Sequence, residues 1–213
     1  MSFGITASSY IGISGLAGLV QQNSSIWTGT TMSVSLPSTT SPLSTIVLII
    51  AGNTIVSTPS GWTLRESQVN MMGHYLFTRT GGTNSWNITT NSGAGTWYAA
   101  EVGGGYETSL SDNDSGGDAW YTTPLLAPTV GNRLLVASIG SVSDEPYTVR
   151  TVSDWTNDFT GVADICNATA DYPMQGVAAR SVTTDGVTSY ETTATYSINS
   201  TGRSAIITSF TVS

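Results

Sequence analysis

Short runs in which apolar and polar residues alternate recur along the whole chain, with turn-forming residues between them. Alternation with a period of two is typical of a β-strand that buries one face. It is clearest at 31–36 and at 190–198. No window of a dozen residues has the i, i+3, i+4, i+7 apolar spacing of an amphipathic helix. The pattern therefore predicts an all-β chain.

Four segments are apolar on both faces, which is typical of strands in the middle of a sheet. An edge strand of this kind would expose unpaired backbone groups beside apolar side chains and invite aggregation. We therefore expect four central strands, at 45–51, 96–102, 134–139 and 205–212. Turn signals rich in Gly, Pro, Asn and Asp lie between them, at 59–61, 81–82, 91–93, 112–118, 185–186 and 199–202.

The two halves of the chain show a weak internal repeat. Each half has an apolar strand, a loop with proline, a tryptophan, a middle strand, an aromatic strand, an Asn-Ser pair and a closing apolar strand. The copies cover about 30–106 and 120–213, with insertions between them. We interpret them as two sets of strands in one antiparallel, jelly-roll-like β-sandwich over 30–213, and not as two independent domains.

Residues 1–29 lie outside this repeat, and we expect them to form an N-terminal docking arm. No charged residue precedes Arg65, and the segment combines many Gly and Ser with scattered apolar residues. Such a segment cannot build its own core, but it can become ordered against a neighbour. The candidates for a partner surface are Phe3, Tyr10, Ile11, Leu16, Leu19 and Trp27 in this arm, and Trp120 in a second irregular stretch.

Charge and cysteine content exclude several classes of function. Charged residues make up 9% of the chain, against roughly 25% in ordinary globular domains. A net charge of −8 and six scattered arginines disfavour nucleic acid as a partner. The single Cys166 cannot form an intrachain disulfide. The apolar stretch at 10–20 is too short for a membrane span and has no basic residue before it, so we expect neither membrane insertion nor a signal peptide.

Residues for catalysis are scarce. The only histidine, His74, stands in an alternating strand, and no nucleophile-elbow motif surrounds any serine, so we interpret it as structural. One His and one Cys without paired spacing predict no zinc site. The acidic residues single out no pair for glycoside hydrolysis. Glu101 interrupts an apolar strand, where we expect it to face solvent or meet an arginine. We predict no catalytic residue and no cofactor.

The acidic stretch at 112–118 has carboxylates at alternate positions followed by glycine, a pattern that can wrap oxygen ligands around Ca²⁺. The position that would carry a closing bidentate glutamate is Thr123. We favour a solvated acidic turn, with a calcium site at Asp112, Asp114 and Asp118 as the alternative.

The six tryptophans could form a platform that stacks sugar rings, or they could be core anchors. Trp62, Trp86 and Trp97 stand where a sandwich needs core anchors, and we expect them to be buried.

One arrangement of motifs resembles a known family. P-S-G-W-T-L at 59–64, W-N-I-T at 86–89, and W-Y-A-A-E-V at 97–102 followed by a Gly-rich turn with Tyr106 are similar to β-sandwich modules in virion proteins of tailed bacteriophages. The resemblance covers about 30–212. Leu43-Ser44 replaces the Gly-Asp turn expected before the first core strand, whereas the second half keeps Gly131-Asn132. The resemblance supplies no functional residues.

The resemblance implies a non-enzymatic structural protein on the outer surface of a bacteriophage virion, as capsid decoration or a minor capsid protein. Its partners would be other virion proteins and further copies of itself. We expect it to be made in the host cytoplasm, and to lie outside the particle because an acidic protein is repelled by packaged DNA. The alternative is a minor tail or tail-tip protein that binds host cell-surface glycan; an esterase or glycosidase is disfavoured.

Overall fold

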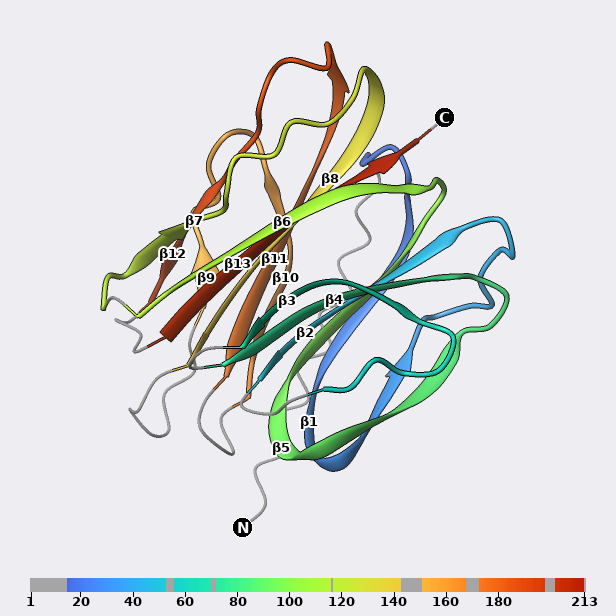
Figure 1. Cartoon of the computed structure of the whole chain (residues 1–213), viewed down its shortest axis with the longest axis vertical. Coiled ribbons are helices and arrows are strands. Elements are labelled where there is room, and N and C mark those ends of the chain that lie inside the picture. Colours follow the sequence, from blue (N-terminus) through green and yellow to red (C-terminus); the bar gives the residue numbers. More distant parts are fainter. Residues whose placement is uncertain are drawn as a thin grey trace.

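The computed structural model describes residues 15–52, 56–69, 72–115, 117–142, 151–167, 173–197 and 202–212. Within these ranges the chain forms thirteen strands in three antiparallel sheets and no helix (Figure 1). The prediction of an all-β antiparallel sandwich is confirmed. No helix in the described ranges is long and apolar enough to span a bilayer.

Each half of the chain builds one five-stranded sheet. The first sheet has the order β1-β5-β2-β4-β3, with β1 at Leu19–Ser35, β2 at Thr45–Gly52, β3 at Thr63–Val69, β4 at Gly73–Thr80 and β5 at Ser85–Val102. The second sheet has the order β10-β11-β8-β13-β6, with β6 at Tyr106–Asp114, β8 at Gly131–Val142, β10 at Thr160–Cys166, β11 at Met174–Thr184 and β13 at Gly202–Thr211.

A small third sheet has the order β7-β12-β9, with β7 at Trp120–Thr122, β12 at Thr193–Tyr196 and β9 at Val152–Ser153. The long strands β1 and β5 pair with each other along their whole length. Their counterparts in the second half are interrupted: β6 pairs with β13, and β7 separately with β12.

The two large sheets share one strand order. Read from β6, the second sheet runs β6-β13-β8-β11-β10, which matches β1-β5-β2-β4-β3 strand for strand once the small sheet is set aside. The two halves that form the internal repeat in the sequence therefore have the same sheet topology. The chain finishes the first large sheet before it starts the second.

Strand alternation divides the core of the first sheet between two faces. Val47 and Ile49 of β2 face the second sheet and pack with Val136 and Ile206. The intervening residues of β2 face the other way, into a second cluster with residues of β1, β4 and β5 and the tryptophans at 27, 62, 86 and 97. Figure 1 shows that the long strands β1 and β5 bend strongly along their length, and residues of both strands belong to this cluster.

The second sheet is covered on its outer face in a similar way. Ile139 and Ala205 pack against Tyr121 and Tyr196 of the small sheet. All four segments predicted as central strands lie inside a sheet and are buried. That prediction is confirmed, and the small sheet explains why the second sheet also has two apolar faces.

The expected boundary of the N-terminal arm at residue 29 is wrong. Leu19 already pairs with Val102, so 19–29 belong to the sandwich. Trp27 is 5% exposed, and a Cβ on Gly95 would stand 2.1 Å from its ring, so it is a core residue and not a partner surface. Leu16 and Leu19 are half-buried against the core between the sheets. Phe3, Tyr10 and Ile11 lie outside the described residues.

The turn expected at 91–93 is also wrong. β5 runs through this segment without a break, and Gly93 pairs with Gly29 of β1. A register shift between Gly29 and Thr31 lies at this level, where a bulge bends a strand pair without ending it. The turn residues therefore mark a bend. The strand expected over 190–198 is shorter than predicted, because only β12 is regular there.

We expect Trp62→Ala to destabilise the protein by about 3 to 5 kcal/mol, the usual cost of removing a buried tryptophan. Trp62 is 7% exposed and meets Trp86 edge to face, with 5.5 Å between the ring centroids. Urea unfolding followed by circular dichroism measures the loss. Trp120→Ala is the matched control, because Trp120 is 54% exposed; equal losses in the two variants would contradict the burial of Trp62.

Candidate functional site

The edge strands of the two large sheets face each other along a polar seam. The Glu66 carboxylate of β3 accepts hydrogen bonds from the hydroxyls of Ser109 (2.9 Å) and Ser111 (2.8 Å) of β6. Gln68 donates to Ser111 at 2.9 Å and accepts from Asn113. Side chains, and not a backbone ladder, therefore join the sheets here. We call this contact the β3–β6 seam.

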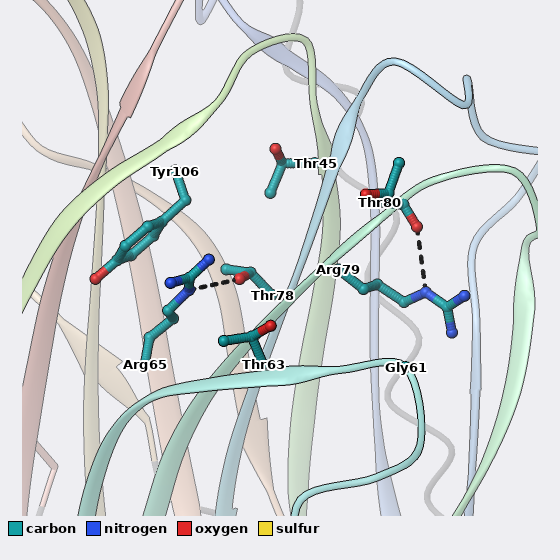
Figure 2. A pocket seen from close by; sticks show the side chains of 8 residues that line it. All are labelled: Thr45, Gly61, Thr63, Arg65, Thr78, Arg79, Thr80 and Tyr106. Atoms are coloured by element: carbon teal, nitrogen blue, oxygen red, sulfur yellow. Dashed lines mark hydrogen bonds between the residues drawn. The ribbon is translucent and has the colours of Figure 1, made fainter.

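A pocket of about 270 Å³ opens at one end of this seam (Figure 2). We call it the Arg65 pocket. Its lining residues come from β2, β4, the start of β3 and the start of β6, and they are Thr45, Gly61, Thr63, Arg65, Thr78, Arg79, Thr80 and Tyr106. The lining is hydroxyl-rich and cationic. It contains no carboxylate, although the protein carries fourteen acidic residues.

Arg65 is held in place on two sides. Its Nε donates a hydrogen bond to Thr78 Oγ1 at 2.8 Å, and its guanidinium carbon lies 4.0 Å from the centroid of the Tyr106 ring. The register of β3 against β4 shifts between Leu64 and Glu66. Such a bulge can redirect a side chain, and here it falls at Arg65. Figure 2 shows the guanidinium beside Tyr106 and over Thr78.

The positive charge of Arg65 has no carboxylate partner among the described residues. Among the described residues, Arg133, Arg180 and Arg203 have a carboxylate partner within 4.0 Å, whereas Arg65 and Arg79 have none. Within the described ranges, the side chain of Arg65 makes one hydrogen bond, the bond from Nε to Thr78. The residue is exposed. Its two terminal nitrogens are therefore available to a ligand.

Arg79 has a different role, although it also lines the pocket. Its guanidinium carbon lies 5.3 Å and 5.4 Å from the ring centroids of Trp62 and Trp86, and its Nε donates to the Thr80 carbonyl oxygen at 3.2 Å. Figure 2 shows its guanidinium pointing away from that of Arg65. Arg79 is thus a cap on the tryptophan cluster at the rim of the pocket.

His74 is a structural link between the sheets. It is fully buried on β4, and its ring nitrogens lie 2.8 Å and 3.0 Å from the hydroxyls of Ser204 on β13 and Ser138 on β8. Burial lowers the pKa of His74 to about 3, although a hydrogen bond of the ring with the Ser204 backbone acts in the opposite direction and raises it. The ring is therefore neutral at ordinary pH and is closed off from solvent.

Glu101 neither faces solvent nor meets an arginine, so both expectations are wrong. Its buried carboxylate accepts hydrogen bonds from Gln21 Nε2 (2.6 Å), Ser44 Oγ (2.7 Å) and the Ser41 backbone N–H (2.7 Å). Burial alone raises the pKa of Glu101, but these bonds lower it below its usual value. Glu101 thereby fixes the loop before β2.

Arg203 lies beside the acidic stretch and pairs with two of its carboxylates. Arg203 lies 2.5 Å from Asp114 and 3.6 Å from Asp118, and it donates to the Trp120 carbonyl oxygen at 2.7 Å. Asp112 accepts a hydrogen bond from the Asn113 backbone. A guanidinium thus supplies a counter-charge to two of the three carboxylates of the calcium alternative, Asp114 and Asp118. In the described ranges, no group of three or more His, Cys, Asp or Glu side chains could hold a metal.

Trp120 is exposed, as a partner surface requires. It is the one aromatic residue among the strongly exposed large hydrophobic side chains of the described ranges, so no row of exposed rings forms a sugar platform there. The sequence did not indicate the Arg65 pocket, because Arg65 and Tyr106 come from different sheets. The available signal was that Arg65 is the first charged residue of the chain.

Comparisons with known proteins add no family. No protein-family model matches the chain, and neither curated proteins nor solved structures show a significant match.

We expect acid to destabilise the protein between pH 6.5 and 4.5 through His74. The unfolded state binds a proton near pH 6.5 and the folded state near pH 3, so stability rises with pH in this window. The slope reaches about 1.4 kcal/mol for each pH unit. Thermal melting over this range measures it.

The variant His74→Gln keeps a neutral hydrogen-bonding side chain and is the control. Its stability should depend much less on pH between 6.5 and 4.5. The lowered pKa values of Glu101 and Glu107 make stability depend on pH below this window. The raised pKa of Asp164 opposes the effect of His74, but it does so equally in the wild type and the variant. An equal slope in the wild type and the variant would contradict a buried neutral His74.

Proposed function

We propose that the protein is a non-enzymatic ligand-binding module and that the Arg65 pocket is its binding site. The observation that carries the proposal is a fixed, exposed and unpaired arginine in a pocket without carboxylates. Placing such a cation at the surface of an acidic protein offers a local positive site for a ligand. This function is compatible with the glycan-binding alternative reached from the sequence.

The other lining groups favour a ligand rich in hydroxyls. The hydroxyls of Thr63 and Thr80 make no hydrogen bond within the described protein, and both residues are exposed. Thr45 Oγ1 donates to the Gly104 carbonyl oxygen at 2.6 Å and keeps lone pairs that can accept. A pocket of about 270 Å³ lies below the usual size of drug-binding pockets, about 300 to 1,000 Å³. It suits a ligand of about one sugar ring.

We expect Arg65→Gln to weaken ligand binding by about tenfold or more, because a charge-assisted hydrogen bond contributes about 1.5 to 3 kcal/mol. The assay titrates ¹⁵N-labelled protein with monosaccharides, neutral and acidic, and follows the amide shifts of β3, β4 and β6. Arg180→Gln is the matched control, because Arg180 is a half-buried surface arginine on β11 outside the pocket. Absence of shifts around the pocket with every sugar would reject the site.

A second proposal is a structural role on the outer surface of a bacteriophage virion. Two loops that precede the central strands β2 and β8 support it, because each holds a strongly exposed aliphatic side chain. Leu43 is 92% exposed in the loop that Glu101 fixes through Ser41 and Ser44. An exposed side chain on a rigid loop buries apolar surface in an interface at a low cost in entropy.

The corresponding loop of the second half is fixed in the same way. Val130 is 70% exposed, and the neighbouring Thr129 backbone N–H donates to the Glu107 carboxylate at 2.9 Å. Glu107 also accepts from Arg133 Nε and Ser209 Oγ, each at 2.7 Å. Burial raises the pKa of Glu107, but Arg133 and the hydroxyl and backbone donors lower it to about 2.

The partners that these two loops would contact are capsid or tail subunits or further copies of this chain.

We expect Leu43→Ser to leave the melting temperature of the isolated protein nearly unchanged and to lower its copy number on purified virions. Burying a leucine side chain contributes about 1.5 to 3 kcal/mol, so the affinity should fall by about tenfold or more. Quantitative immunoblotting of particles measures the copies. Leu110→Ser is the control, because Leu110 is also an exposed leucine but lies on strand β6 and in neither of the two loops. Unchanged copy number with Leu43→Ser would reject this contact.

A further inference from the structure

We infer that the Arg65 pocket selects a sugar that bears a carboxylate, such as a uronic acid, over the corresponding neutral sugar. This inference rests on the proposed binding function and specifies the chemistry of its ligand. It follows from the part of the guanidinium that remains free, from the charge around the pocket and from the hydroxyls beside it.

The contacts of Arg65 leave one edge of its guanidinium open. Thr78 occupies the Nε–H, and the Tyr106 ring covers one face of the plane. The edge formed by the two terminal nitrogens then remains, with parallel N–H groups at a fixed spacing. This fork matches the two oxygens of a carboxylate, and such bidentate pairs are among the stronger hydrogen bonds in proteins.

The fork is also preorganised. Arginine ordinarily loses side-chain freedom when it binds a ligand, but here the hydrogen bond to Thr78 and the stacking on Tyr106 have already fixed it. No protein carboxylate has to leave first. Arg133 and Arg203 differ in this respect, because Glu107 and Asp114 already neutralise them. Among the described arginines, Arg65 is thus the one best prepared to accept a carboxylate from outside.

The surrounding charge favours one carboxylate over a long polyanion. The nearest acidic neighbour in the chain, Glu66, turns into the β3–β6 seam, where two serine hydroxyls satisfy it, and it does not line the pocket. A ligand with a single carboxylate therefore meets the positive charge of Arg65 without an acidic side chain in the pocket lining. A long sulfated or phosphorylated chain would also meet the rest of a protein with a net charge of −8 and be repelled.

The threonine hydroxyls distinguish a sugar acid from a simple anion. Thr63 lies opposite Thr78 in the β3–β4 register, and Thr80 lies opposite Thr45 in the β2–β4 register. All four side chains line the pocket around Arg65. Hydroxyl groups can both donate and accept, so they complement the ring hydroxyls of a sugar while the arginine binds its carboxylate.

The test is isothermal titration calorimetry of the full chain with three probes of the same ring: methyl β-D-glucuronide, the neutral methyl β-D-glucoside, and the amide of the glucuronide. We expect the glucuronide to bind about tenfold or more tighter than either neutral probe. Arg65→Gln should remove this preference, and Arg65→Lys should retain only part of it, because lysine keeps the charge but lacks the fork. Melting temperatures of the variants verify that each is folded.

Further measurements make the result specific. Arg180→Gln is the control and should retain the preference, because Arg180 lies on β11 and does not line the pocket. Arg79→Gln tests the other arginine of the lining, whose guanidinium points away from that of Arg65. Acetate and inorganic phosphate should bind more weakly than the glucuronide, since neither offers ring hydroxyls to the threonines. Loss of the preference in Arg79→Gln alone would assign the anion site to the wrong arginine and overturn the inference.

The possible failures are distinguishable. Equal affinity for the glucuronide and the glucoside would overturn the carboxylate selectivity and leave the proposed sugar-binding function standing. Acetate or phosphate binding as tightly as the glucuronide would also overturn the inference, because the pocket would then be a simple anion site. Absence of binding by all probes would reject the inference and the proposed function together.

Discussion

The central strands of both sheets are apolar on two faces, and this constraint determines the rest of the architecture. Packing the two large sheets against each other covers one face of each, as Val47 and Val136 show. The remaining apolar faces need covers of their own. The first sheet obtains its cover by bending β1 and β5 over itself, and the second by the interrupted counterparts of these strands, β7 and β12. In both halves, the strands at the same positions of the topology cover the outer apolar face of the sheet.

The repeat extends to a polar feature that is not visible in the sequence alignment of the halves. In each sheet one glutamate accepts a backbone N–H from the loop that leads into the central strand: the buried Glu101 from Ser41, and the half-buried Glu107 from Thr129. The two glutamates come from strands that do not correspond, since Glu101 lies on β5 and Glu107 on β6. The two glutamates thus come from different positions in the repeat, but each carboxylate binds the loop before the central strand of its sheet.

Periodicity in the sequence was sufficient for the fold class, the central strands and the burial of Trp62, because these follow from which faces must avoid water. It was insufficient wherever contacts cross between sheets. Arg203 lies far along the chain from the acidic stretch that it neutralises, so 112–118 looked like a loop for solvent or calcium. Trp27 looked exposed because its ring packs on Gly95 of β5, a residue that comes beside it only through the pairing of β1 with a distant strand. The Arg65 pocket needs both sheets and could not be predicted for the same reason.

The β3–β6 seam has a consequence for the behaviour of the protein in concentrated solution. Exposed sheet edges recruit strands from other molecules, and many proteins prevent this with edge lysines. This chain contains no lysine. Its edge strands β3 and β6 instead face each other through Glu66 and its serine partners, and on the opposite side Gln22 of β1 donates to the Val162 carbonyl oxygen of β10 at 3.4 Å. Each edge therefore shields another, and a protein with few charges limits strand-to-strand aggregation by geometry in place of electrostatic repulsion.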